Sequence, residues 1–182
     1  MQRIALIERK DMTAEQASVY DAATSDPDAP RTGPYGIYIR LPRLFAAMQQ
    51  LRASLAAGPL SLRERQIVNL AVARHWNARY PWFAQVRRSR AAGIGAPVIE
   101  AINLRRTPDL PDLRERTCFT VAHDMLAGKG LSAAVYAAAE QTMGTADLVA
   151  LVAAVGNFSM TCLTAVAFQL APPDNDPLPL KQ

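Results

Sequence analysis

Chemically versatile side chains gather between positions 75 and 85 of this 182-residue chain. Gln85 could orient a bound molecule by hydrogen bonding, and Tyr80 could donate a hydrogen bond or a phenolic proton. His75 could exchange protons near neutral pH, although a histidine at a helix end also suits an interaction with the negative end of that helix. Because an amide does not titrate, Gln85 cannot be a general acid or base. Gln85, Tyr80 and His75 are the candidate catalytic residues.

Aromatic and arginine side chains indicate how a substrate would be held. Trp82 could form the wall of a pocket for a flat or apolar molecule, or it could belong to the core. Arg40 and Arg74 are suited to hold a carboxylate through paired N–H groups, with ion pairs between subunits as the alternative. Tyr35 is a further substrate-binding candidate, with the anchoring of a loop as its alternative. These residues together predict an organic acid as substrate.

Histidine and cysteine are too few and too scattered for a metal or thiol site. His75 and His123 lie in no cluster with cysteines, so no metal is expected, and a carboxylate-only site is the one alternative left. Asp124 follows His123, but adjacent residues on a helix point to different sides, which argues against a base with its orienting acid. Cys118 and Cys162 form no Cys-x-x-Cys pair, which is typical of reduced, buried thiols in a cytoplasmic protein. We therefore predict a cofactor-independent protein without thiol peroxidase activity.

Charge and hydropathy argue against nucleic-acid and membrane partners. The net charge is +4, and the 20 Lys and Arg residues are interspersed with 16 Asp and Glu. The one dense basic run, residues 87–90, lacks the interleaved aromatics and the surrounding motif of a nucleic-acid site. The apolar stretch 146–170 is interrupted by Asp147, Asn157 and Gln169, which favours a buried helix over a membrane span. No targeting segment is visible near the N-terminus.

Helix signals recur along the chain, while strand signals are nearly absent. Thr13 and Ser61 each open a capping box, and Asp112 repeats the same pattern. Prolines at first-turn positions start further helices. The pattern predicts an all-α fold of about seven to eight helices. The predicted helices begin near Thr13, Pro42, Ser61, Pro81, Ala96, Asp112, Ser132 and Thr145.

The helices are expected to form one domain over residues 1–172, with an extended or disordered tail over residues 173–182. Residues 26–36, rich in Pro, Gly and Asp, are predicted to be a loop. One tetrapeptide, Leu-Arg-Glu-Arg, occurs twice, at residues 62–65 and again 51 positions later at 113–116. It marks either two good helix starts or the trace of a duplicated helical hairpin.

The segment Tyr80–Gln85, with the Ala-Ala-Gly-Ile of residues 91–94, resembles the signature of the carboxymuconolactone decarboxylase-like family, a branch of the alkylhydroperoxidase-D-like superfamily. The family pattern reads Tyr-Glu-Trp-x-x-His, so Pro81 replaces its Glu and Gln85 its His. Residues 33–44, 63–66 and 156–158 also match family segments, with Gln66 in place of an acid. The likeness covers roughly residues 3 to 170. It adds Gln66 to the substrate-binding candidates.

The resemblance implies an all-helical fold, usually assembled as a trimer or hexamer with pockets close to subunit contacts. In relatives that decarboxylate a lactone, the signature His and nearby acids move protons, and neither is present here. The resulting hypothesis is a lyase or isomerase that decarboxylates, cyclises or rearranges a carboxylated or polycyclic organic acid. Gln85 and Tyr80 would orient the substrate, while His75 or an arginine would replace the lost acid or base.

The alternative is a catalytically silent binding or assembly protein that kept the oligomeric scaffold. The two hypotheses differ in what they require of the pocket. An enclosed cavity lined by Gln85, Trp82, Tyr80 and an arginine would favour the enzyme, and a collapsed one the silent protein.

Overall fold

Local sequence signals set most of the helix boundaries. The computed structural model describes residues 2–26, 29–128, 130–173, 176 and 178–181. These ranges contain no strand, so the all-α prediction is confirmed. The helices are α1 (Ala14–Ala22), α2 (Pro34–Tyr38), α3 (Pro42–Ala56), α4 (Leu62–His75), α5 (Arg79–Ala91), α6 (Ala96–Asn103), α7 (Leu113–Gly128) and α8 (Ala133–Ala167).

The predicted caps are formed as the sequence indicates. The side chains of Thr13 and Ser61 each accept a hydrogen bond from the backbone N–H three residues later. The side chain at that later position, Gln16 or Glu64, in turn accepts a hydrogen bond from the backbone N–H of Thr13 or Ser61. Asp112 Oδ1 accepts from the backbone N–H of Glu115 at 2.9 Å. Caps of this kind satisfy N–H groups that have no partner inside the helix, so they fix where α1, α4 and α7 begin.

Two boundaries differ from the prediction. The predicted loop at residues 26–36 ends early, because Pro34 starts the short helix α2 directly after Gly33, whose φ is +59°. Helix α5 begins at Arg79, two residues before Pro81. Pro81 is tolerated there because the first four N–H groups of a helix have no partner within it.

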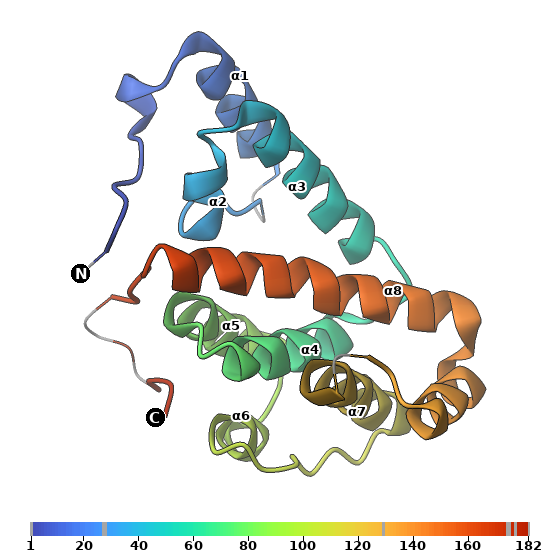
Figure 1. Ribbon diagram of the computed structural model, residues 1–182. Coiled ribbons are helices and arrows are strands. Elements are labelled where there is room, and N and C mark those ends of the chain that lie inside the picture. Colours follow the sequence, from blue (N-terminus) through green and yellow to red (C-terminus); the bar gives the residue numbers. More distant parts are fainter. Residues whose placement is uncertain (1, 27–28, 129, 174–175, 177, 182) are drawn as a thin grey trace.

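Helix α8 lies between two layers of helices (Figure 1). Helices α1, α2 and α3 lie on one side of it, and α4, α5, α6 and α7 on the other. Gly144, with φ +79°, breaks α8 into two segments, which confirms the predicted division before Thr145. By length and composition alone α8 could cross a membrane, but the core helix of a soluble protein meets the same criterion. Asp147, in its second segment, accepts a hydrogen bond from Arg114 at 3.0 Å.

The repeated tetrapeptide joins α4 to α7 through two reciprocal ion pairs. Arg63 Nε donates to Glu115 Oε1 at 2.6 Å, and Arg114 Nε donates to Glu64 Oε1 at 2.8 Å. The two glutamate side chains are only 10% and 6% exposed, so each requires a cation close by. Each copy of the tetrapeptide supplies the arginine for the other copy's glutamate. The N-terminal ends of α4 and α7 are thereby held together.

The described residues near the C-terminus lie against α5 and α6. Trp82 Nε1 donates to the carbonyl oxygen of Leu178 at 2.9 Å, and Asn103 Nδ2 donates to that of Pro179 at 3.1 Å. The backbone N–H of Lys181 donates to Asn103 Oδ1 at 2.9 Å, and Leu178 also packs against the core. This part of the predicted tail is therefore extended and hydrogen-bonded. Residues 174, 175, 177 and 182 lie outside the described residues.

The crossed ion pairs predict a measurable coupling. We expect Arg63→Ala and Glu115→Ala each to lower the free energy of unfolding by about 1–3 kcal/mol, a range that allows for the partly exposed Arg63. The double variant should lose less than the sum by about 1 kcal/mol, since the second change removes no further ion pair. Urea unfolding measures all three. Arg90→Ala, which removes an exposed α5 side chain, is the control and should change stability by less than about 0.5 kcal/mol. Strictly additive losses would contradict the coupling.

Candidate functional site

A cavity of about 750 Å³ opens between the two layers of helices. Its walls come from α1, α2, α3, α4, α5, α8 and the segment that leads into α2. The volume lies within the range of small-molecule sites in proteins. Its polar lining residues are Tyr20, Arg31, Thr32, Tyr35, Arg52, Arg65, Gln66, Asn69, Tyr80, Gln85, Arg88, Asn157 and Thr161.

Carboxamide side chains form one wall of the cavity. Gln66 and Gln85 are 5% and 4% exposed. Asn69 Nδ2 donates to Gln85 Oε1 at 3.4 Å, and Ser89 Oγ donates to Gln66 Oε1 at 3.5 Å. Both glutamines use their oxygens in these bonds, which leaves their NH₂ groups for a ligand. Asn157 Oδ1 is buried with no hydrogen-bond partner among the described residues, so it also offers a place for a ligand or water.

Two tyrosines border the cavity. Burial raises the pKa of Tyr35 to about 12, so its phenol stays protonated at neutral pH and acts as a hydrogen-bond donor. Tyr80 packs against Gly33, where a Cβ atom would come within 2.2 Å of the Tyr80 ring. The Tyr80 and Thr32 hydroxyl oxygens are 3.3 Å apart. Gly33 is thus required both by its left-handed φ and by the position of the Tyr80 ring.

The cavity is positively charged. Four arginines line it, Arg31, Arg52, Arg65 and Arg88, and no Asp, Glu, His, Lys or Cys is among the described lining residues. Arg52 forms an ion pair with Asp26, and Arg65 donates to the carbonyl oxygens of Ala56 and Leu60.

Within the described residues, the other two arginines of the cavity form no ion pair with an acid. Arg31 lies over the Tyr20 ring at 5.9 Å from its centroid, and Arg88 has no ion-pair partner within the described ranges. The described residues hold no group of three or more His, Cys, Asp or Glu side chains that could bind a metal ion. The arrangement therefore suits a small molecule with negative charge.

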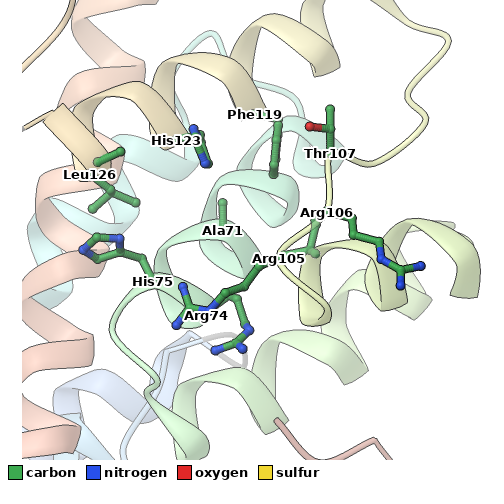
Figure 2. A pocket seen from close by; sticks show the side chains of 11 residues that line it. Ala71, Arg74, His75, Arg105, Arg106, Thr107, Phe119, His123 and Leu126 are labelled. Carbon is green, nitrogen blue, oxygen red and sulfur yellow. The ribbon is translucent and has the colours of Figure 1, made fainter. Parts of the chain in front are cut away.

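The sequence-based candidates divide between this cavity and other places. Gln85, Tyr80, Tyr35 and Gln66 line the cavity, and their catalytic or substrate-binding roles stay predictions. His75 and Arg74 do not, because they line a second, smaller cavity on the opposite side of α4 (Figure 2). His75 lies nine residues after Gln66, a rotation of about 180° around the helix axis.

Two more candidates are placed elsewhere. Trp82 is fully buried in the core instead of lining the cavity, since its ring packs among apolar side chains and its N–H is bonded to Leu178. Arg40 donates to the carbonyl oxygen of Ala5 at 2.6 Å and lies outside the cavity lining. Neither residue lines the large cavity, and the burial of Trp82 agrees with the core placement that the sequence left open as its alternative. A substrate-binding role for Trp82 or Arg40 stays a prediction.

The sequence analysis missed most of the basic residues of the site. Arg88 belongs to the basic run at 87–90. It differs from Arg87 and Arg90 only because it lies on the side of α5 that faces the cavity. Asn69 lies three residues after Gln66, so helical spacing could have identified it. Arg31 and Arg52 come from a loop and from α3, and no local spacing links them to α5.

Solved structures with the same fold have been described as related to peroxidases. A peroxidase-related protein with an alkylhydroperoxidase AhpD core from Ralstonia eutropha JMP134 matches with a TM-score of 0.76 at 17% identity, over 95% of this chain and 93% of that chain. A peroxidase-related protein from Silicibacter sp. TM1040 matches with a TM-score of 0.75 at 18% identity, over 96% of this chain and 93% of that one.

A third solved structure is shorter. It is a protein of unknown function from Agrobacterium tumefaciens, described as a candidate antioxidant defence protein AhpD, and it matches with a TM-score of 0.68 at 17% identity. The match covers 75% of this chain and 95% of that chain. No protein-family model and no curated protein sequence matches the chain. The chain therefore has the AhpD-like all-helical fold.

The cysteines of this chain are placed unlike reactive thiols. Cys118 and Cys162 are both fully buried and unpaired. Burial raises the pKa of Cys118 to about 12 and also raises that of Cys162, so neither forms a thiolate at neutral pH. Neither cysteine lines the large cavity.

We expect the purified protein to have no thiol-dependent peroxidase turnover above background. The physical reason is that the thiolate is the nucleophile in such chemistry, and burial suppresses it at both cysteines. A coupled assay with a dithiol reductant and hydrogen peroxide or an organic hydroperoxide makes the measurement. A robust rate that Cys118→Ser abolishes would show that this interpretation is wrong.

Proposed function

We propose that the large cavity of this AhpD-like chain binds a carboxylated organic molecule and acts on it as a cofactor-independent lyase or isomerase. The observation that carries the proposal is the composition of the lining, in which four arginines occur without an acid among the described residues. Arg88 has no ion-pair partner in that part of the chain. A substrate carboxylate would supply the missing negative charge.

The cavity supports catalysis by fixed donors better than catalysis by proton transfer. No lining residue that the structure describes has an ordinary pKa between about 4 and 9, so this part of the chain supplies no conventional general base to the cavity. The NH₂ groups of Gln66 and Gln85 and the phenol of Tyr35 are buried donors that could stabilise an enolate oxygen. A decarboxylation fits this arrangement, because the electrons of the broken C–C bond pass to a carbonyl oxygen and carbon dioxide leaves. The same donors would also stabilise a rearrangement of the carbon skeleton in which negative charge develops on a carbonyl oxygen.

A binding protein without catalysis is the second candidate. The described lining holds no His, Asp, Glu, Lys or Cys, which favours this second candidate. The open cavity of about 750 Å³ argues against a collapsed, purely structural site. Both candidates share the carboxylated ligand. Turnover distinguishes them.

We further propose that the chain assembles with copies of itself through the outer face of α8. Its second segment exposes large apolar side chains at helical spacing, Val149, Val152, Met160, Leu163 and Val166, and these are 37–63% exposed. An apolar stripe of this kind usually marks a protein contact. Light scattering of the purified chain tests this, and a monomer at micromolar concentration would contradict it.

Arg88→Ala should weaken binding of the carboxylated ligand about tenfold or more, since a charge-assisted hydrogen bond to a carboxylate is lost. Binding is measured by calorimetric or thermal-shift titration with a panel of aromatic and alicyclic carboxylic acids. Each acid is compared with its neutral amide. Mass spectrometry of the same mixtures detects loss of carbon dioxide or isomerisation. Arg90→Ala, on the same helix but outside the cavity lining, is the matched control and should bind like the parent.

Equal binding of acids and amides would overturn the proposed ligand class. Carboxylate-selective binding without a product would support the second candidate function.

The same assays give a sharper test at Gln85. Gln85→Ala should leave the protein folded but weaken binding or turnover by about 1–3 kcal/mol, because a buried donor to the ligand is lost. Gln85→His places a titratable group in the cavity, so activity should acquire a pH dependence with a midpoint near 6 to 7, whereas the parent profile should be flat there. If both variants behave like the parent, Gln85 is only part of the scaffold.

A further inference from the structure

The second cavity lies at the other end of α4 from the ion pairs. It has a volume of about 110 Å³ and is formed where the C-terminal parts of α4 and α7 meet the loop after α6. The cavity is lined by Ala71, Arg74, His75, Ile102, Arg105, Arg106, Thr107, Phe119, His123, Leu126 and Ala127. Every ionisable side chain among these described residues is basic.

The basic side chains of the cavity come from three elements. In Figure 2 Arg74 and Arg105 lie close together, His75 extends from α4 toward Leu126, and His123 lies across from them on α7, while Arg106 points away. Arg74 is only 6% exposed. Its Nε donates to the carbonyl oxygen of Asn103 at 2.7 Å and its Nη1 to Asn77 Oδ1, so its bonds in the described chain go to neutral oxygens.

A buried arginine without a carboxylate is costly, and here a second cation lies beside it. Arg105 Nη2 donates to Asn77 Oδ1 at 3.1 Å, the same oxygen that Arg74 uses. Burial and the charge of Arg105 lower the pKa of Arg74, and burial, Arg105 and His123 lower that of His75. The acid nearest in sequence, Asp124, interacts with the charge of His123 but accepts a hydrogen bond from the backbone N–H of Ser132.

Arg74 and Arg105 meet where α4 and α6 end. Asn77 and Arg105 have φ values of +50° and +58°, and each lies just beyond the last turn of its helix, where a left-handed residue commonly ends a helix. The backbone N–H groups of Ala78 and Arg106 close the two ends by donating to the carbonyl oxygens of Ala73 and Ala101. These helix ends bring the Arg105 guanidinium beside Arg74, so that both donate to Asn77.

We infer that this second cavity is a binding site for a tetrahedral oxyanion of the phosphate class, either free or at the end of a larger molecule. The volume is sufficient for one such group with its water, and Arg74, Arg105, His75 and His123 supply donors on several sides. A dianion neutralises two arginines, which a single carboxylate does not. The Phe119 ring gives one wall an apolar surface that an ester of phosphate could contact. This inference does not depend on the function proposed for the large cavity.

The test is calorimetric titration of the full chain with inorganic phosphate, acetate and phenyl phosphate at constant ionic strength. We expect saturable binding of phosphate. Acetate should bind at least about tenfold more weakly, a difference in affinity of the size that one charge-assisted hydrogen bond contributes. Arg105→Ala removes an exposed side chain and should leave the fold intact, while phosphate affinity falls about tenfold or more. Tight binding of phenyl phosphate would identify the phosphoryl group of a larger molecule as the ligand, and binding of phosphate alone would identify the free ion.

Because arginines also line the large cavity, a cross-control is needed. Arg88→Ala alters the large cavity only and should leave phosphate affinity unchanged. His123→Ala, on α7, should weaken phosphate binding in the same direction as Arg105→Ala. Absence of saturable phosphate binding, or loss of it in Arg88→Ala but not in Arg105→Ala, would overturn the assignment.

Discussion

The crossed ion pairs between Arg63 and Glu115 and between Arg114 and Glu64 set the relation of α4 to α7, on which the rest of the structure depends. Both glutamates are nearly buried, and each also takes part in the cap at the start of its helix. Glu64 accepts from the backbone N–H of Ser61, and the backbone N–H of Glu115 donates to Asp112. A buried carboxylate without a cation is strongly unfavourable, so a shift of one helix against the other would lose both pairs. The register of the two helices is fixed at their N-terminal ends.

With that register fixed, α4 becomes a wall between two cavities. One side of the helix presents Gln66 and Asn69 to the large cavity, and the other presents Arg74 and His75 to the small one. Gln66 and His75 are nine residues apart along α4 and about 180° apart around its axis, so they cannot contact the same small ligand. This separation explains why the amides and the histidine do not form one catalytic group.

The large cavity combines an AhpD-like fold with a chemistry of fixed donors and positive charge. Its lining holds amides, phenols and guanidinium groups, while both cysteines are buried elsewhere in the core. A fold constrains which chemistry is possible much less than the side chains that line its cavity. Two of the solved structures that share the fold are described as peroxidase-related, whereas both thiols of this chain are buried away from the large cavity.

The sequence alone determined the helices and part of the cavity. Capping residues act over three positions, so Thr13, Ser61 and Asp112 specify helix starts without any distant contact. Gln85 and Tyr80 were identified because they occupy the first and last positions of a segment that resembles a family signature. Tertiary structure decided the crossing of the tetrapeptides, the burial of Trp82 under the C-terminal segment, and the gathering of Arg31, Arg52 and Arg88 around one cavity. These features depend on how helices distant in sequence rotate and pack against each other, and local spacing carries no information about that rotation.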